Sequence, residues 1–188
     1  MQLKNQPQTY GWISILMHWT IALAVFGTFA LGFWMVDLDY YSTWYHDAPN
    51  IHKSVGVLLV MAMLARFFWN QFNPKPKALT ASNLQKSVAK TVHVVLYLLI
   101  FFIGVSGYLI STAESQPISV FNWFEVPAWF TPFADQADIA GDIHKWLGYS
   151  LMGLVALHAF AALKHHYINK DNTLKRMLKP IFNNANSK

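Results

Sequence analysis

Residues 142–167 read DIHKWLGYSLMGLVALHAFAALKHHY, and this stretch decides the fold. No charged residue lies between Lys145 and Lys164, and a helix of about 20 mostly apolar residues is long enough to cross a membrane. His144 and His158 are 14 residues apart, so on an α-helix they lie on nearly the same face, ~21 Å apart along the axis. The stretch therefore predicts a membrane-spanning helix that presents one imidazole toward each side of the bilayer.

Three further segments are strongly apolar, and they lie near 12–36, 51–72 and 89–111. The second of them carries Arg66 well inside, and a charged residue within a membrane span marks a functional contact by default. Only 12% of the 188 residues are charged, whereas a soluble domain carries about a quarter. We therefore expect an all-α fold, an integral membrane four-helix bundle that residues 1–188 form as a single domain.

The basic residues outside the spans predict the orientation. The segments 37–50 and 112–141 contain acidic residues but no lysine or arginine. The middle connection and the C-terminal tail contain Lys75, Lys77, Lys86, Lys90, Lys164, Lys170, Lys175, Arg176, Lys179 and Lys188. Basic loops stay in the cytoplasm, so both termini face inward in a bacterial inner membrane. The net charge of +5 is thus explained by topology, and no nucleic-acid partner is expected.

Four histidines form two pairs that match in depth. His52 opens the second span from the outside, at the level of His144, while His18 lies at the inner level of His158. Two pairs at separate depths indicate two non-covalent b-type haems, each held by two histidines. Zinc or copper needs further ligands nearby, and a helix–helix hydrogen bond is the alternative for any one histidine. The chain has no cysteine, which excludes iron–sulfur clusters and covalent haem attachment.

Residues near these histidines agree with haem binding. His52 and His144 each begin the pattern His-Lys-x-x-Gly, which places Gly56 and Gly148 one turn later on the same face, where a flat macrocycle needs room. Arg66 follows His52 by 14 residues, and we expect it to face the propionates of the inner haem.

Two other histidines have competing interpretations. His93 lies at roughly the depth of His18, so it is either a rival inner ligand or a packing residue. His165 lies seven residues beyond His158, on the same side and ~10 Å closer to the cytoplasm. It is either an ordinary interfacial histidine or a hydrogen-bond donor to a quinone carbonyl.

The chain resembles the bacterial cytochrome b561 family, close kin to the cytochrome b subunits of hydrogenases and formate dehydrogenases. The resemblance rests on His18-Trp19, His52-Lys53-Ser54-Val55-Gly56, Arg66, His144-Lys145-Trp146-Leu147-Gly148-Tyr149, His158, His165-His166-Tyr167 and Lys170-Asp171-Asn172-Thr173-Leu174. It implies a four-helix bundle in which His18 and His158 hold one b haem and His52 and His144 hold the other. It also implies quinone-linked electron transfer with His165 at the quinone site. Some members are similar to superoxide oxidases, which pass the electron from superoxide to ubiquinone.

We therefore expect transmembrane electron transfer by a quinone-linked oxidoreductase of the superoxide oxidase type in the respiratory chain. Electrons would pass from an outer donor through the outer and inner haems to ubiquinone near His165 and Lys75 or Lys77, or in the reverse direction from the quinone pool. Lys53 and Lys145 are the only basic residues on the outer side. They would either attract a small anion such as superoxide, or neutralise haem propionates or extend to the interface.

Two alternatives remain at this stage. The chain would instead be a cytochrome b subunit that takes electrons from a periplasmic partner protein, or a haem-free transporter that uses its histidines. The second lacks a buried carboxylate to relay protons. The expected partners are the lipid bilayer, a quinone, and superoxide or a periplasmic donor, with a homodimer as a further option.

Overall fold

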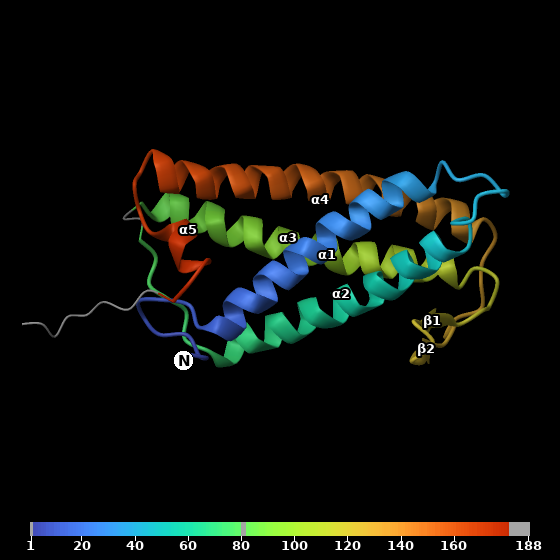
Figure 1. Cartoon of the computed structure of the whole chain (residues 1–188), viewed down its shortest axis with the longest axis horizontal. Coiled ribbons are helices and arrows are strands. Elements are labelled where there is room, and N and C mark those ends of the chain that lie inside the picture. The colour runs from blue at the N-terminus through green and yellow to red at the C-terminus, as the bar shows by residue number, and fades with distance from the viewer. Residues whose placement is uncertain (1, 80–81, 181–188) are drawn as a thin grey trace, which may run out of the picture.

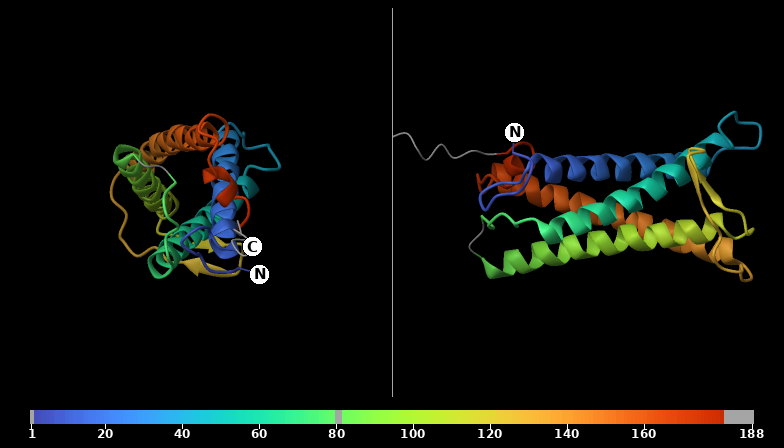
Figure 2. Two further views of the ribbon diagram at one scale, coloured as in Figure 1. Left: turned by 90° about the vertical axis from the view of Figure 1, so that its left-hand side faces the viewer. Right: turned by 90° about the horizontal axis from the view of Figure 1, so that it is seen from below.

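The computed structural model describes residues 2–79 and 82–180. Four long helices run side by side along the molecule: α1 (Trp12–Met35), α2 (Asp47–Phe72), α3 (Asn83–Ser111) and α4 (Gln136–Tyr167) (Figures 1 and 2). Each is long and apolar enough to cross a membrane. The predicted fold class, an all-α membrane bundle of four helices, is therefore confirmed.

Three helices begin earlier than hydropathy predicts, at residues 47, 83 and 136 instead of 51, 89 and 142. The added turns contain polar residues such as Asp47 and Asn83, and α3 is capped by the Ser82 side chain, which accepts a hydrogen bond from the Gln85 amide. Capping by serine stabilises a helix start without any apolar signal. The polar first turns extend beyond the apolar part of each span, which is why hydropathy alone misses them.

The bundle core contains one buried residue from each long helix: Val25, Met63, Ile100 and Leu151. Leu151 is seven residues from both His144 and His158, and Val25 is seven residues from His18. Two helical turns separate residues seven apart. The apolar layer therefore lies midway between the two levels of histidines and separates them.

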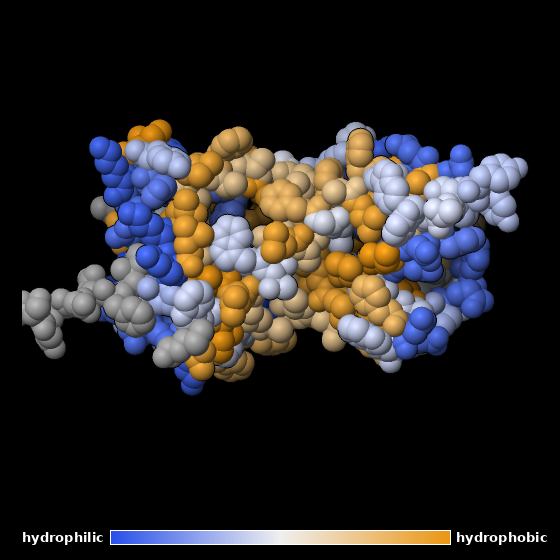
Figure 3. Space-filling model, viewed as in Figure 1, coloured by the Kyte–Doolittle hydropathy of each residue, from blue (hydrophilic) through white to orange (hydrophobic). Residues whose placement is uncertain are grey.

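The surface of the bundle is apolar in the middle and polar at both ends (Figure 3). Large apolar side chains are exposed along the helices, among them Leu23, Phe26, Leu157 and Phe160. A soluble protein rarely exposes an apolar surface of such extent, whereas a bilayer solvates it. The chain is therefore a multi-pass membrane protein.

A short hairpin, which was not predicted, lies at the end of the bundle opposite the N-terminus (Figure 1). Its strands β1 (Ile118–Val120) and β2 (Phe124–Val126) pair antiparallel, with Ser119 opposite Glu125. The Ser54 hydroxyl of α2 accepts a hydrogen bond from the Phe121 amide (3.1 Å) and donates one to the Ser119 carbonyl (3.3 Å). These bonds attach the hairpin to α2 two residues after His52.

At the other end, three segments distant in sequence are joined by hydrogen bonds. The Trp19 indole of α1 donates to the Met177 carbonyl (2.6 Å), just beyond α5 (Thr173–Arg176). Arg176 donates to the Lys77 carbonyl (2.8 Å), and the Lys77 amide donates to Pro7 (2.8 Å). The N-terminal segment, the middle loop and the C-terminal tail thus meet on the side that carries the basic residues.

Candidate functional site

The outer predicted pair comes together between α2 and α4. The ring centroids of His52 and His144 are 6.1 Å apart, and the ring planes are inclined by 67°. The Nδ1 atom of His144 lies 3.1 Å from the Ile103 carbonyl oxygen and 3.1 Å from the Ser106 hydroxyl, both on α3. In the tautomer with the proton on Nδ1, His144 donates to the Ile103 carbonyl and Nε2 keeps its lone pair for a ligand bond.

The inner predicted pair also comes together, and a third histidine joins it. The centroids of His18 on α1 and His158 on α4 are 6.3 Å apart, with planes inclined by 68°. His93 on α3 lies closer to His158, with centroids 5.3 Å apart. Within residues 2–79 and 82–180, no three histidine or acidic side chains are grouped so that they could hold one metal ion. The inner level therefore offers two pairs that share His158.

Glycines from neighbouring helices make room for the two outer rings. A Cβ atom on Gly32 of α1 would lie 3.0 Å from Cε1 of His52, and one on Gly107 of α3 would lie 3.2 Å from Cε1 of His144. Real Cβ atoms almost never lie closer than 3.0 Å to such an atom, and 3.2 Å is also a tight contact. A larger residue at either glycine would therefore push the neighbouring histidine ring away. Sequence reasoning missed Gly107, although it follows His93 by the same interval of 14 residues that relates Gly32 to His18.

The two glycines predicted to leave space, Gly56 and Gly148, do face open space. A Cβ atom added to either would meet no other atom within 4 Å. They follow His52 and His144 by one helical turn. The backbone beside both outer histidines is therefore unobstructed.

Arg66 lies on α2 near the inner histidines. Its guanidinium is half-buried and donates a hydrogen bond to the Ser14 carbonyl on α1 (3.3 Å). Its charge also interacts electrostatically with His18, His93 and His158. In the described part of the chain this carbonyl is the hydrogen-bond partner of the guanidinium, which leaves its other N–H groups available to a further acceptor.

His165 forms a close pair with a carboxylate that sequence reasoning did not select. Its Nδ1 atom lies 2.6 Å from Asp171 Oδ2, while Asp171 Oδ1 accepts a hydrogen bond from the Thr173 amide (2.8 Å). Burial raises the pKa of Asp171, but the hydrogen bonds from Thr173 and His165 outweigh it and hold that pKa below its ordinary value. In the described part of the chain, no hydrogen bond or ion pair joins Lys75 or Lys77 to His165.

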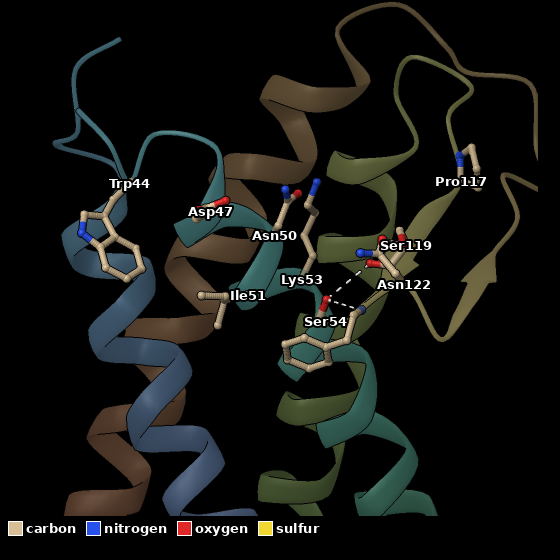
Figure 4. A pocket seen from close by; sticks show the side chains of 10 residues that line it. Trp44, Asp47, Asn50, Ile51, Lys53, Ser54, Pro117, Ser119 and Asn122 are labelled. Carbon is tan, nitrogen blue, oxygen red and sulfur yellow. Dashed lines mark hydrogen bonds between the residues drawn. The ribbon is translucent and has the colours of Figure 1, made fainter. Parts of the chain in front are cut away.

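The two outer lysines differ in their surroundings. Lys53 is half-buried and lines a cavity of about 410 Å³ between the start of α2 and the hairpin (Figure 4). Lys145 is exposed and does not line this cavity. Among the residues that the structure describes, neither lysine forms an ion pair. Both charges thus remain on the outer side, one in a cavity and one in the open.

Comparison with known proteins relates the chain to one family. The family model of prokaryotic cytochrome b561 matches residues 9–180. "Cytochrome b561 homolog 2" of Escherichia coli is 52% identical over 179 residues, which are 95% of each chain. "Cytochrome b561 homolog 1" of the same organism is 29% identical, over 87% of this chain and 93% of its own.

A third relative, "Probable superoxide oxidase CybB" of Yersinia pestis, is 29% identical over 90% of this chain and 95% of its own. The match to the family covers all four spans and both levels of histidines. The chain therefore belongs to the prokaryotic cytochrome b561 family, whose members transfer electrons in membranes with b-type haem.

Proposed function

We propose that the chain holds two b-type haems, one between His52 and His144 and the other between His18 and His158. It transfers electrons across the bacterial inner membrane, from a donor on the outer side to ubiquinone on the cytoplasmic side. The observation that carries the proposal is the distance between the two imidazole rings within each pair. The ring centroids are 6.1 Å apart in the outer pair and 6.3 Å apart in the inner pair.

These separations fit two imidazoles that would hold one iron between them. A metal–nitrogen bond is ~2 Å long and the ring centre lies ~1 Å beyond the nitrogen, so two such imidazoles would have centroids about 6 Å apart. The distance of 5.3 Å between His93 and His158 is shorter than this. It favours His18 as the inner partner of His158 and a neighbouring role for His93.

Several residues around His52 and His144 favour the binding of a haem at the outer site. The Ile103 carbonyl can accept a hydrogen bond from Nδ1–H of His144, which leaves the Nε2 lone pair free and fixes the ring orientation. Gly56 and Gly148 leave their side of the backbone open. When bound, a b-type haem with two histidine ligands supplies reversible one-electron transfer without an open coordination position for substrate.

Arg66 can serve the inner site in a different way. A half-buried guanidinium in a membrane span needs anionic or polar partners, and the Ser14 carbonyl satisfies only part of its five donors. Haem propionates are anionic acceptors that suit a guanidinium. Arg66 would therefore stabilise a propionate at the level of His18 and His158.

At the cytoplasmic end, His165 would bind and protonate the quinone. Asp171 lies 2.6 Å from Nδ1 and orients the ring, so that Nε2 can donate to a quinone carbonyl. With superoxide as donor, two superoxide anions and two protons convert one ubiquinone to ubiquinol and release two molecules of dioxygen. The relative named as a probable superoxide oxidase supports this choice of donor.

Replacing Asp171 with asparagine is expected to lower kcat for ubiquinone reduction about tenfold or more, because His165 loses the carboxylate that orients its ring. KM should change less, since the His165 ring remains. The measurement is steady-state ubiquinone reduction by the purified, haem-loaded protein, with haem content checked by absorbance.

Asp171→Glu keeps the carboxylate and should restore much of the rate, while Asp138→Asn at the outer end is the matched control. An Asp171→Asn enzyme with the wild-type kcat would remove the proposed role of the His165–Asp171 pair.

Reversing both outer charges tests whether the donor is a small anion. Lys53→Glu combined with Lys145→Glu should slow reduction by superoxide by about tenfold at low salt and weaken its salt dependence, because electrostatic attraction raises association rates by such factors. Stopped-flow reduction of the haems by superoxide at several ionic strengths measures this effect. An unchanged rate would exclude electrostatic attraction of the donor.

The proposed function as a whole is tested in proteoliposomes that contain ubiquinone. Superoxide generated outside should be consumed as ubiquinol forms, and the ratio should be two superoxide anions per ubiquinol. Haems that superoxide does not reduce, together with a periplasmic protein that does reduce them, would support the cytochrome b subunit instead.

A further inference from the structure

A polar cavity lies at the outer end of the bundle, next to the start of α2, and none of the paired histidines lines it. It has a volume of about 410 Å³. Its walls come from the loop before α2, from the first two turns of α2 and from the hairpin (Figure 4). Pockets for small molecules have volumes of about 300–1,000 Å³, so this one suits a group of modest size.

The cavity contains one positive and one negative side chain that are not paired with each other. Lys53 and Asp47 both line it, and within residues 2–79 and 82–180 the only ion pair at 4 Å or less joins His165 to Asp171. A lysine and an aspartate that line one cavity but form no ion pair with each other can each bind an oppositely charged group of a zwitterionic ligand.

The serine hydroxyl groups that line the cavity already form hydrogen bonds within the protein. A ligand would therefore be held by the other polar side chains of the cavity. Ser54 bonds to the hairpin backbone, and the Ser119 hydroxyl donates to the Asn122 side-chain oxygen (3.2 Å). Among the residues that the structure describes, no hydrogen bond uses the Asn122 amide nitrogen or the Asn50 side chain, and both line the cavity with Lys53 and Asp47. The donors Lys53 and Asn122 suit an anionic group, while the acceptors Asp47 and Asn50 suit a primary ammonium group.

The position of the cavity identifies the source of such a molecule. The cavity lies at the first turns of α2, at the polar end of this span, and aromatic side chains are common where a protein meets lipid headgroups. Trp44 and Phe121 contribute to its walls, and Trp123 and Trp129 are exposed in the outer loop. A phospholipid headgroup with a phosphate and a primary ammonium group meets both requirements.

We propose that this cavity is a binding site for the phosphoethanolamine headgroup of a phospholipid, with the phosphate at Lys53 and Asn122 and the ammonium group at Asp47 and Asn50. A bound headgroup would link α2 to the hairpin, beside His52. The proposal does not depend on the function proposed above, because binding can be measured without electron transfer.

The test is calorimetric titration of the purified, haem-loaded protein in detergent with dihexanoyl phosphatidylethanolamine. The same titration is made with dihexanoyl phosphatidylcholine, dihexanoyl phosphatidylglycerol and free phosphoethanolamine. The ethanolamine lipid should bind about tenfold more tightly than the other two lipids, since choline cannot donate hydrogen bonds and glycerol carries no positive charge.

Lys53→Gln and Asp47→Asn should each weaken binding of the ethanolamine lipid about tenfold, and Lys53→Arg should retain it. Lys145→Gln and Asp138→Asn are the matched controls, since each alters the same residue type at the start of α4 outside the cavity, and they should leave binding unchanged. Thermal unfolding of every variant separates lost binding from lost folding.

Equal affinity for the three lipids, or equal effects of cavity and control variants, would overturn the proposal. Free phosphoethanolamine that binds as tightly as its lipid would also overturn it, because the ligand would then be a soluble zwitterion.

Discussion

Replacing His158 with alanine is expected to remove the inner haem and to lower the haem content by about half. His158 lies at the centre of the inner level, 6.3 Å from His18 and 5.3 Å from His93 between ring centroids, so its loss breaks either pair. The outer pair shares no residue with it and should keep its haem. The measurement is the reduced-minus-oxidised spectrum of the purified variant, normalised to protein.

His93→Ala is the informative comparison for this variant, and His46→Ala is the matched control, because His46 is exposed in the outer loop. Both should retain the full haem content. A His158→Ala protein with undiminished pigment would contradict the inner site. Loss of the inner haem in His93→Ala with retention in His18→Ala would instead identify His93 as the second inner ligand.

Replacing Gly32 with leucine is expected to remove the outer haem while the inner one remains. A Cβ atom at this position already lies 3.0 Å from Cε1 of His52, and the larger side chain would displace the imidazole from its place opposite His144. Functional groups must be held within about 0.5 Å of their working geometry. We therefore expect the outer haem to be lost, with a haem content of about half.

Gly27→Leu is the matched control for this substitution. It lies on the same helix, and a Cβ atom there meets no other atom within 4 Å. The two variants change helix propensity equally, so a difference between them reports the contact with His52. Full haem content in Gly32→Leu would show that the outer ring does not depend on this close approach.

The fold and the two pairs of histidines could be predicted because the length, apolar composition and helical periodicity of membrane spans can be recognised in a sequence. Spans are long and apolar, and residues 14 apart, such as His144 and His158, lie on one face at known depths. The depths of His144 and His158 on one helix then suffice to choose a partner for each from the other helices. The structure brings together His52 with His144 and His18 with His158, as that reasoning predicts.

Features that depend on contacts between distant segments could not be predicted. Ser54 of α2 forms hydrogen bonds with hairpin residues more than 60 positions later in the chain, and no local pattern in β1 predicts that contact. Asp171 reaches His165 because the chain turns back after α4, with Lys170 in the left-handed region at φ 55°. Such a turn cannot be inferred from helical periodicity, which ends with the helix.

The function proposed for this chain depends on pairs of imidazoles that bind iron at two depths. The most direct measurement is the haem content per chain of the purified wild-type protein, taken with its reduced-minus-oxidised spectrum. The predicted result is two b-type haems per chain with a sharp α band that is lowered by half in both His144→Ala and His158→Ala. A flat spectrum, or one haem per chain, would contradict it.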